Sequence, residues 1–242
     1  MMPPCHQLLL SAIFAVLTGA SALAGCEAVP RTTLALYDSA REASPRDTRI
    51  HRYAELVLNY LGHVVIYHDL ARNATPSVNP ASVGLVMSWL DAPVGDVSAV
   101  GAWLAQDKAF CGDGPGIVAF GDLAPWAAID PSGQMMAAMG VEWDPHIRAI
   151  SVTAPVIARD RSLMDHEADF LLVPGDYSSV SATSSARILL QIGSPEQPLT
   201  LATLGPGGGY VHTSGAVQTT TEGKAAWVID PFGFLEAVLR QD

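Results

Sequence analysis

TLALYDSAREASPRDTRIHRYAELVLNYLGHVVIYHDL, residues 33–70, is the stretch that decides the fold. Its two ends, 33–39 and 63–70, are apolar runs bounded by polar turn residues, which predicts two strands. Between them, residues 48–62 place apolar side chains three and four positions apart, as on one face of a helix that stops at Gly62. A strand, a helix and a strand in this order form a right-handed crossover, so we expect the two strands to be parallel.

The same alternation continues along the first half of the chain. Residues 84–90 and 116–123 predict two further strands, with a helix over 96–106 between them. Near-continuous apolar strands that alternate with helices are typical of a doubly wound α/β fold, whose mostly parallel sheet is covered on both faces. From residue 147 onward the pattern changes to strands joined by tight Gly and Pro turns. We interpret this second half as a β-rich C-terminal extension of the same sheet.

The chain closes on DPFGFLEAVLRQD, residues 230–242. Asp230 is placed to cap a helix, and the proline that follows it suits the first helical position. We expect Phe232, Leu235 and Leu239 to form the inner face of this helix.

Composition and charge describe a globular chain. Apolar residues make up 49% and charged residues 15% of the 242 residues, which is far from the composition of a disordered protein. There are 24 acidic and 13 basic side chains, for a formal net charge of −11. Nucleic acid and anionic lipid both require clustered Lys and Arg, so neither is expected as the main partner.

The N-terminus has the pattern of an exported bacterial lipoprotein. It contains no charged side chain before Glu27, is apolar from Leu8 onward and ends in Leu-Ala-Gly-Cys at residues 23–26. This ending is typical of a lipobox, so we expect residues 1–25 to be a lipoprotein signal peptide and Cys26 to be acylated. Residues 26–32 would then be a lipidated tether, followed by a single α/β domain over residues 33–242.

Two features of this N-terminal region bear on whether it is cleaved and on which membrane the protein reaches. The first seven residues, MMPPCHQ, lack the usual Lys or Arg, which leaves a simple cleaved signal and an uncleaved anchor as alternatives. Glu27 stands where an inner-membrane retention signal more often has Asp, which favours the outer membrane and a periplasm-facing location.

CGDGPGIVAFGDLAPW, residues 111–126, raises the question of a catalytic cysteine. In an elbow-type enzyme the nucleophile follows its strand, whereas Cys111 precedes the strand at 116–123. The turn after that strand offers Gly121 and Asp122 in place of a thiol or hydroxyl. We therefore expect a buried or turn-lining thiol and no catalytic residue, and we interpret the glycine-rich GPGGGY at 205–210 as a hairpin or bulge, not a phosphate loop.

Polar side chains gather where the predicted strands end, which is the edge at which open α/β sheets bind ligands. Some of them follow the strands, and the others begin the first helix. The possible ligand-binding rim consists of Asp38, His51, Arg52, His68, Asp69, Trp89 and Asp122.

This rim has two interpretations. It forms a pocket for a polar ligand, with a sugar stacked on Trp89, or its aspartates only cap turns and helices, as this topology requires in any case. A metal site among Asp38, His51, His68 and Asp69 is possible by residue type, but no HxH, HExxH or paired CxxC motif supports one. We expect no metal and no cofactor.

Three separated segments resemble a known family. Residues 34–70, the motif ATLGPGGGYVHTSG at 202–215 and WVIDPFGFLEAVL at 227–239 resemble the Rossmann-like region of Pel-type exopolysaccharide deacetylase proteins. That region is similar to a degenerate class I glutamine amidotransferase, which implies a flavodoxin- or amidotransferase-like fold. The deacetylase domain that follows it in those proteins has no counterpart in this sequence, and neither has the elbow cysteine of the amidotransferases.

The resemblance implies a non-catalytic module that works beside an exopolysaccharide machine. We therefore expect a lipid-anchored periplasmic protein that binds or scaffolds a polysaccharide or a protein of that machinery. The alternative is a glycan-active hydrolase or transferase that uses the acidic rim around Asp38, Asp69 and Asp122.

Overall fold

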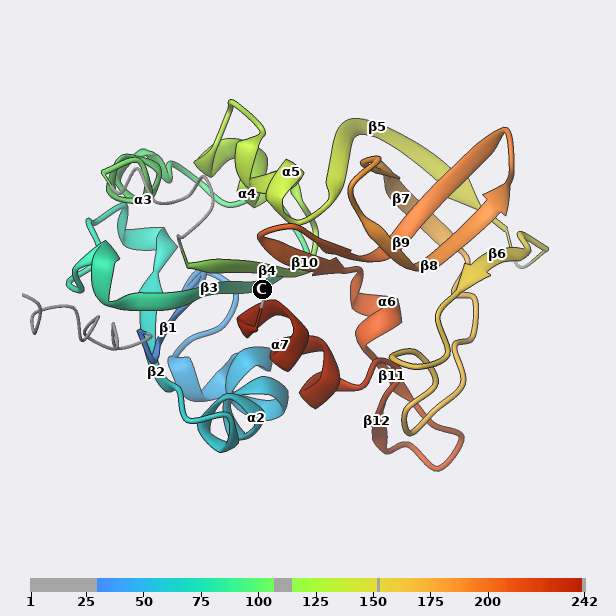
Figure 1. Cartoon of the computed structure of the whole chain (residues 1–242), viewed down its shortest axis with the longest axis horizontal. Coiled ribbons are helices and arrows are strands. Elements are labelled where there is room, and N and C mark those ends of the chain that lie inside the picture. Colours follow the sequence, from blue (N-terminus) through green and yellow to red (C-terminus); the bar gives the residue numbers. More distant parts are fainter. Residues whose placement is uncertain (1–29, 107–114, 152, 241–242) are drawn as a thin grey trace, which may run out of the picture.

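The computed structural model describes residues 30–106, 115–151 and 153–240, and its centre is one eight-stranded sheet (Figure 1). The strands follow the order β2-β1-β3-β4-β10-β9-β8-β6 across this sheet. In chain order they are β1 (Thr32–Tyr37), β2 (Val64–Asp69), β3 (Val83–Leu90), β4 (Gly116–Gly121), β6 (Val156–Arg159), β8 (Arg187–Ser194), β9 (Gln197–Gly205) and β10 (Gly208–Val211).

The sheet is parallel on one side and antiparallel on the other. β2, β1, β3, β4 and β10 form successive parallel pairs, while β10, β9, β8 and β6 pair antiparallel. The predicted strands at 33–39 and 63–70 are therefore parallel neighbours, as the crossover rule requires. β10 belongs to both halves and forms the seam between them.

Helices cover both faces of the parallel half (Figure 1). α3 (Ser98–Leu104), α4 (Ala124–Ile129) and α5 (Gln134–Ala138) lie on one side, and α2 (Glu55–Tyr60) and α7 (Pro231–Leu239) lie on the other. Trp103 and Trp126 are fully buried from the first layer, and Leu58 and Phe234 from the second. This arrangement confirms the doubly wound α/β class.

The first helical segment is not a regular α-helix throughout. It begins with a π-helical turn, η2 (Ile50–Ala54), in which the amide of Glu55 bonds to the carbonyl of Ile50, five residues back. Thr48 serves as the cap, because its Oγ1 accepts the amide of His51 at 3.0 Å. Gly62 ends the segment with a φ of 85°, as predicted from its position.

The β-rich second half joins the main sheet only in part. β6, β8, β9 and β10 extend it, but β5 (Val141–Ile150) and β7 (Gly175–Ala182) form a separate two-stranded ribbon, as do β11 (Val217–Thr219) and β12 (Ala225–Trp227). The pattern of residues 209–215 predicts a strand, but β10 ends at Val211 and a short helix, α6 (Thr213–Ala216), begins two residues later. Three short 3-10 turns, η1 (Pro45–Asp47), η3 (Leu70–Arg72) and η4 (Pro80–Ser82), complete the described elements.

The glycine-rich segment 205–210 is the predicted hairpin, because Gly205 and Gly208 face each other across antiparallel β9 and β10. Two of its glycines leave no room for a side chain. A Cβ on Gly208 would lie 2.0 Å from the carbonyl oxygen of Ile117, and one on Gly209 would lie 2.5 Å from the ring of Phe234. Glycine is therefore required at these positions by close approach of the neighbouring backbone and core.

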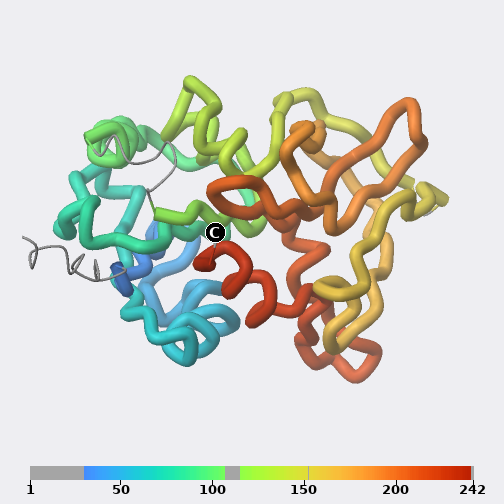
Figure 2. The backbone as a smooth tube through the Cα atoms, in the orientation of Figure 1, coloured from blue at the N-terminus to red at the C-terminus, as the bar shows by residue number. Residues whose placement is uncertain are grey.

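The C-terminal helix returns against the start of the chain. α7 lies beside α2 in the tube view, where the red end meets the blue segment (Figure 2). Asp230 caps it, since a side-chain oxygen accepts the amide of Phe232 at 3.0 Å. Phe234, Leu235 and Val238 form the inner face. Leu235 is buried as predicted, whereas Phe232, predicted to point inward, is 39% exposed, because Phe234 and Val238 occupy the inner face beside Leu235.

Of the helices in residues 30–106, 115–151 and 153–240, none combines the length and the apolar character needed to span a bilayer.

Candidate functional site

The first group of rim residues lies at the edge of the sheet, where β1 and β2 end. The side chains of Asp38 and Asp69 are both buried there, and Ser39, the residue after Asp38, donates its amide to Asp69 Oδ1 at 3.1 Å. Asp38 Oδ1 also accepts the amide of Ala40 at 2.9 Å. Asp69 Oδ1 accepts the amide of Ala71 at 3.1 Å. Each carboxylate therefore caps its own turn, which is the second of the two interpretations of these aspartates.

An arginine side chain lies beside each of these two aspartates. Arg72 Nε donates to Asp69 Oδ2 at 3.0 Å, and Arg41 Nε lies 3.5 Å from Asp38 Oδ2. Burial alone would raise the pKa of Asp69, but the hydrogen bonds from Ser39 and Ala71 and the charge of Arg72 outweigh it and lower that pKa. Asp69 is thus held as a carboxylate.

Asp122 has the same structural role at the end of β4. Its Oδ1 accepts the amide of Ala124 at 2.9 Å and so caps α4, and its own amide donates to the carbonyl of Leu90 at 2.6 Å. Gly121 makes this turn with a φ of 98°.

The three basic residues of the predicted rim stand apart from its aspartates. His51 is exposed, and its Nδ1 lies 2.6 Å from Glu55 Oε2, the oxygen that also accepts the hydroxyl of Tyr67. Arg52 is exposed on the same helical turn as His51. His68 is half-buried, and this burial lowers the pKa of its imidazole. Within the described part of the chain, no hydrogen bond or ion pair joins these three residues to the rim aspartates.

Trp89 is a core residue, which corrects the prediction of a sugar platform there. Its side chain is only 3% exposed. The ring stacks on Phe120 with centroids 4.7 Å apart and contacts Tyr53 and Trp227 at 5.7 and 5.8 Å. β3 is flanked by β1 and β4 and covered on both faces, so an aromatic side chain near its end is enclosed.

A second polar group lies at the carboxyl ends of β3 and β10, in the middle of the sheet. Asp91, just after β3, forms an ion pair through Oδ2 with Nη2 of Arg49 and accepts the hydroxyl of Thr213 on Oδ1 at 2.5 Å. Burial opposes ionisation of Asp91, yet the bonds from Arg49 and Thr213 lower its pKa. Three segments distant in sequence are thereby joined by one carboxylate.

His212 and Ser214 adjoin this group at the start of α6. The amide of Ser214 donates to Nδ1 of His212 at 3.3 Å, so that nitrogen must be the unprotonated one. Ser214 Oγ lies 2.8 Å from the same Nδ1 and therefore donates its hydroxyl proton to it. Tyr177 of β7 packs against the imidazole with ring centroids 4.7 Å apart. A hydroxyl aimed at an imidazole lone pair is the arrangement of a nucleophile and its base.

The electrostatics of this pair oppose such a role. Burial lowers the pKa of His212 to about 4, and the charge of Asp91 offsets this only in part. A general base works best with a pKa near the operating pH. His212 is therefore a neutral acceptor that caps α6, and a weak base at neutral pH.

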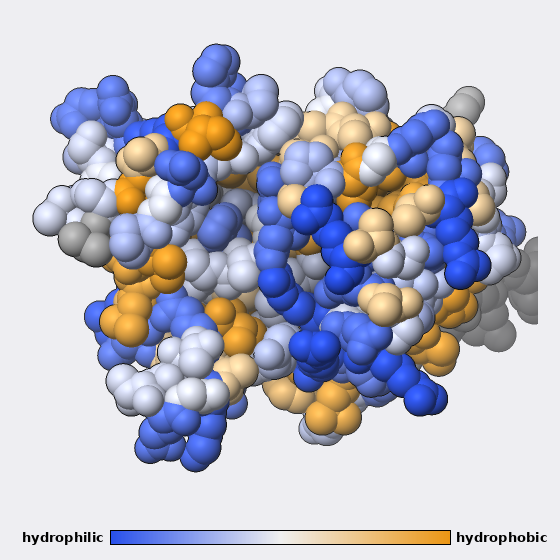
Figure 3. Space-filling model, turned by 180° about the vertical axis from the view of Figure 1, so that it is seen from behind, coloured by the Kyte–Doolittle hydropathy of each residue, from blue (hydrophilic) through white to orange (hydrophobic). Residues whose placement is uncertain are grey.

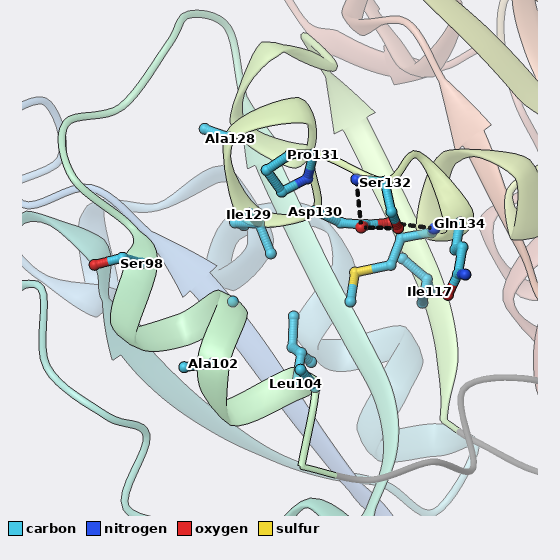
Figure 4. Close-up of a pocket in the computed structure, with 13 residues that line it drawn as sticks. Ser98, Ala102, Leu104, Ile117, Ala128, Ile129, Asp130, Pro131, Ser132 and Gln134 are labelled. Carbon is cyan, nitrogen blue, oxygen red and sulfur yellow. Dashed lines mark hydrogen bonds between the residues drawn. The ribbon is translucent and has the colours of Figure 1, made fainter.

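A cavity lies elsewhere, away from both polar groups. It has a volume of about 680 Å³ between α3, α4 and α5, with a mostly apolar lining that includes Leu104 and Met135 (Figure 4). Ile117 places it near the amino end of β4, away from the rim. Its one carboxylate is already bonded, since Asp130 accepts the amide of Ser132 at 3.0 Å and that of Met135 at 2.8 Å.

The described residues contain no group of three or more His, Cys, Asp or Glu side chains arranged to hold a metal ion. Cys26 and Cys111 lie outside the described residues, so their predicted roles are untested by the geometry.

The polar group around Asp91 and His212 is not predicted from the sequence. His212, Thr213 and Ser214 lie in residues 209–215, whose pattern predicts a strand, and Tyr177 lies in β7, which the sequence does not predict. A usable signal was present, since Thr-Ser-Gly after the short strand Gly-Gly-Tyr-Val marks a strand that turns into a helix with hydroxyl groups at the turn.

No protein-family profile and no curated protein matches the sequence. Six chains of solved structures are similar to it, and they include the following three. A ThuA-like protein from Bacteroides uniformis shares 14% identity at a TM-score of 0.42, covering 78% of this chain and 83% of that one. A glutamine amidotransferase from Thermotoga maritima shares 10% identity at 0.41, covering 77% of each chain. A cold-adapted β-galactosidase from Rahnella sp. R3 shares 13% identity at 0.42, covering 85% of this chain but 30% of the enzyme.

Proposed function

We propose that this protein is a non-catalytic, lipid-anchored module of the bacterial cell envelope that binds or scaffolds a component of exopolysaccharide modification or export. An acyl group on Cys26 would hold it at the outer membrane, facing the periplasm. Its glycan partner would be a partly deacetylated amino-sugar polymer, whose ammonium groups are attracted by a net charge of −11.

One observation carries the choice of binding over catalysis. The rim aspartates Asp38, Asp69 and Asp122 each accept a backbone amide two residues further along the chain. Acid–base catalysis needs a carboxyl group that is free to exchange a proton near neutral pH. Carboxylates that hold turns together do not meet this need, and this supports a role in which the strand ends are structural.

Calorimetry with partly deacetylated chito-oligosaccharides tests the binding role. We expect saturable binding that weakens as salt screens the acidic protein. Absence of binding to any amino-sugar oligomer, together with absence of an envelope protein in pull-downs with the full chain, would contradict the proposal.

Matched variants separate binding from catalysis. Asp38→Asn, Asp69→Asn and Asp122→Asn each keep an oxygen that can cap the turn but remove its charge and acidity. We expect all three to retain glycan binding and no turnover of envelope glycans in either the variants or the parent. Turnover that these substitutions abolish would establish the enzymatic alternative.

The anchor has its own test. Cys26→Ser should move the protein from the membrane fraction to the soluble periplasm, and mass spectrometry should find the acyl mass only on the parent chain.

A second candidate function, hydrolysis through Ser214, is favoured by its 2.8 Å contact with Nδ1 of His212 at the end of β10. A fluorophosphonate probe distinguishes the two functions. Labelling of the parent that is lost in Ser214→Ala would establish a nucleophilic serine, whereas we expect no labelling, because the imidazole is too weak a base.

A further inference from the structure

Two aromatic rings stand exposed where α2 and α7 meet. Tyr60 is 80% exposed at the end of α2, and Phe232 is 39% exposed at the start of α7. Their ring centroids lie 5.3 Å apart and their planes are perpendicular, at 90°. Leu56, 78% exposed, lies one helical turn before Tyr60. Because the two rings are perpendicular, their faces point in two directions and form two adjoining sides of one apolar surface.

Polar side chains border these rings. Asn59 is exposed next to Tyr60. Glu236 and Arg240 follow Phe232 at steps of four residues and so share its side of α7. The two are joined by an ion pair of 2.7 Å between Arg240 Nη2 and Glu236 Oε1. We call these residues the α2–α7 surface, which comprises Leu56, Asn59, Tyr60, Phe232, Glu236 and Arg240.

The rings are carried on rigid supports. Val57 and Leu58 anchor α2 in the core, and Phe234 and Leu235 anchor α7. The two helices pack against each other on the same face of the sheet (Figure 1). An aromatic pair on such supports loses little conformational freedom when a ligand binds, which favours affinity.

The chemistry of the surface suits a sugar ring. The C–H groups of a pyranose carry partial positive charge and match the negative face of an aromatic ring, while its hydroxyl groups need donors and acceptors beside that face. An ammonium group on an amino sugar gains a further attraction to the negative face of the Tyr60 ring. Nucleic acid is a poor match, since the described protein is acidic overall.

A protein partner fits the surface less well. Stable protein interfaces use about 20–30 residues from each side, whereas the α2–α7 surface offers three large apolar side chains among polar ones. On the opposite side of the molecule, hydrophobic residues also occur as small separate groups among hydrophilic ones (Figure 3). One or two sugar units match a platform of this size.

We propose that Tyr60 and Phe232 form the stacking platform for an amino-sugar unit of the glycan, an inference that rests on the proposed binding function. This places glycan recognition on the helical layer and not at the strand ends, where Trp89 is buried.

Calorimetry of the full chain with a partly deacetylated chito-oligosaccharide tests this platform. The double variant Tyr60→Ala and Phe232→Ala should lose affinity by about tenfold or more. Tyr60→Phe should retain binding, because it keeps the ring. Leu171→Ala, which truncates a 66% exposed apolar side chain elsewhere, is the matched control and should bind like the parent.

The outcomes of this experiment distinguish an error in the proposed stacking platform from an error in the proposed binding function. The double variant should unfold at nearly the parent temperature, since both rings are exposed. If the parent binds the oligosaccharide and the double variant binds within about twofold of it, the platform is wrong and the proposed function survives. If the parent binds no glycan, the platform is wrong, and the proposed function then stands or falls on whether the full chain captures an envelope protein in pull-downs.

Discussion

His212 should make the stability of this protein fall sharply in mild acid. Its pKa is lowered from 6.5 to about 4 by burial. As the pH falls, the unfolded chain therefore takes up a proton first, so the stability is complete above about pH 6.5 and is lost between there and about pH 4. Between pH 8 and pH 5 this one group accounts for about 2 kcal/mol of lost unfolding free energy. The ring keeps some contact with solvent, so this is an upper value.

Urea unfolding at pH 8 and pH 5 measures the effect. His212→Asn removes the titrating ring but leaves a side-chain oxygen to accept the amide of Ser214, because Asn is a favoured helix cap. We expect the variant to lose about 2 kcal/mol less than the parent between the two pH values. His63, whose pKa burial also lowers, titrates in both proteins and cancels in the comparison.

Thr213→Val is the control, since it removes the hydrogen bond to Asp91 without removing an imidazole, and its loss should be equal at both pH values. If the parent and His212→Asn lose the same stability within about 0.5 kcal/mol, the imidazole is not held neutral and the electrostatic description of this site is wrong.

Three further predictions concern the fold. Gly208→Ala places a methyl group 2.0 Å from a carbonyl oxygen of β4 and should cost about 3 kcal/mol in urea unfolding, whereas Gly95→Ala, which meets no atom within 4 Å, should stay within about 1 kcal/mol of the parent. Asp230→Ala removes the cap of α7 and should cost about 1 kcal/mol, while Asp230→Asn should recover most of it; equal losses would argue against capping. Ser88→Ala leaves the buried Nε1 of Trp126 without its 2.8 Å partner and should lower the free energy of unfolding by about 1–3 kcal/mol, and an unchanged midpoint would contradict this.

The parallel half of the fold could be predicted because its signals are local. The strand at 33–39, the helix at 48–62 and the strand at 63–70 each show their own periodicity, and the crossover rule then fixes how they pair. The separate ribbon of β5 and β7 could not be predicted in the same way, since β7 is exposed over much of its length and has weak apolar alternation.

The polar groups at the strand ends show what a local pattern leaves out. Asp38, Asp69 and Asp122 were found because each lies at the end of a strand, and each proves to cap the turn there. The bond between Asp91 and Thr213 joins residues 122 positions apart, so only the assembled sheet brings them together. Sequence order also gives no sign that Trp89 is enclosed, since that depends on which strands flank β3.

β10 joins the parallel and the antiparallel halves of the main sheet, because it pairs with β4 on one side and with β9 on the other. Close packing of Gly208 against β4 holds the start of β10 beside that strand, and Thr213, which bonds to Asp91, follows two residues after β10 ends. Gly209 leaves room for the ring of Phe234, which anchors α7 on the opposite side of the same strand. A side chain at either glycine would shift the strand end or the helix. The two glycines that begin this short strand thus allow the close packing that positions both the polar group at the sheet's carboxyl edge and the helix that carries Phe232 of the α2–α7 surface.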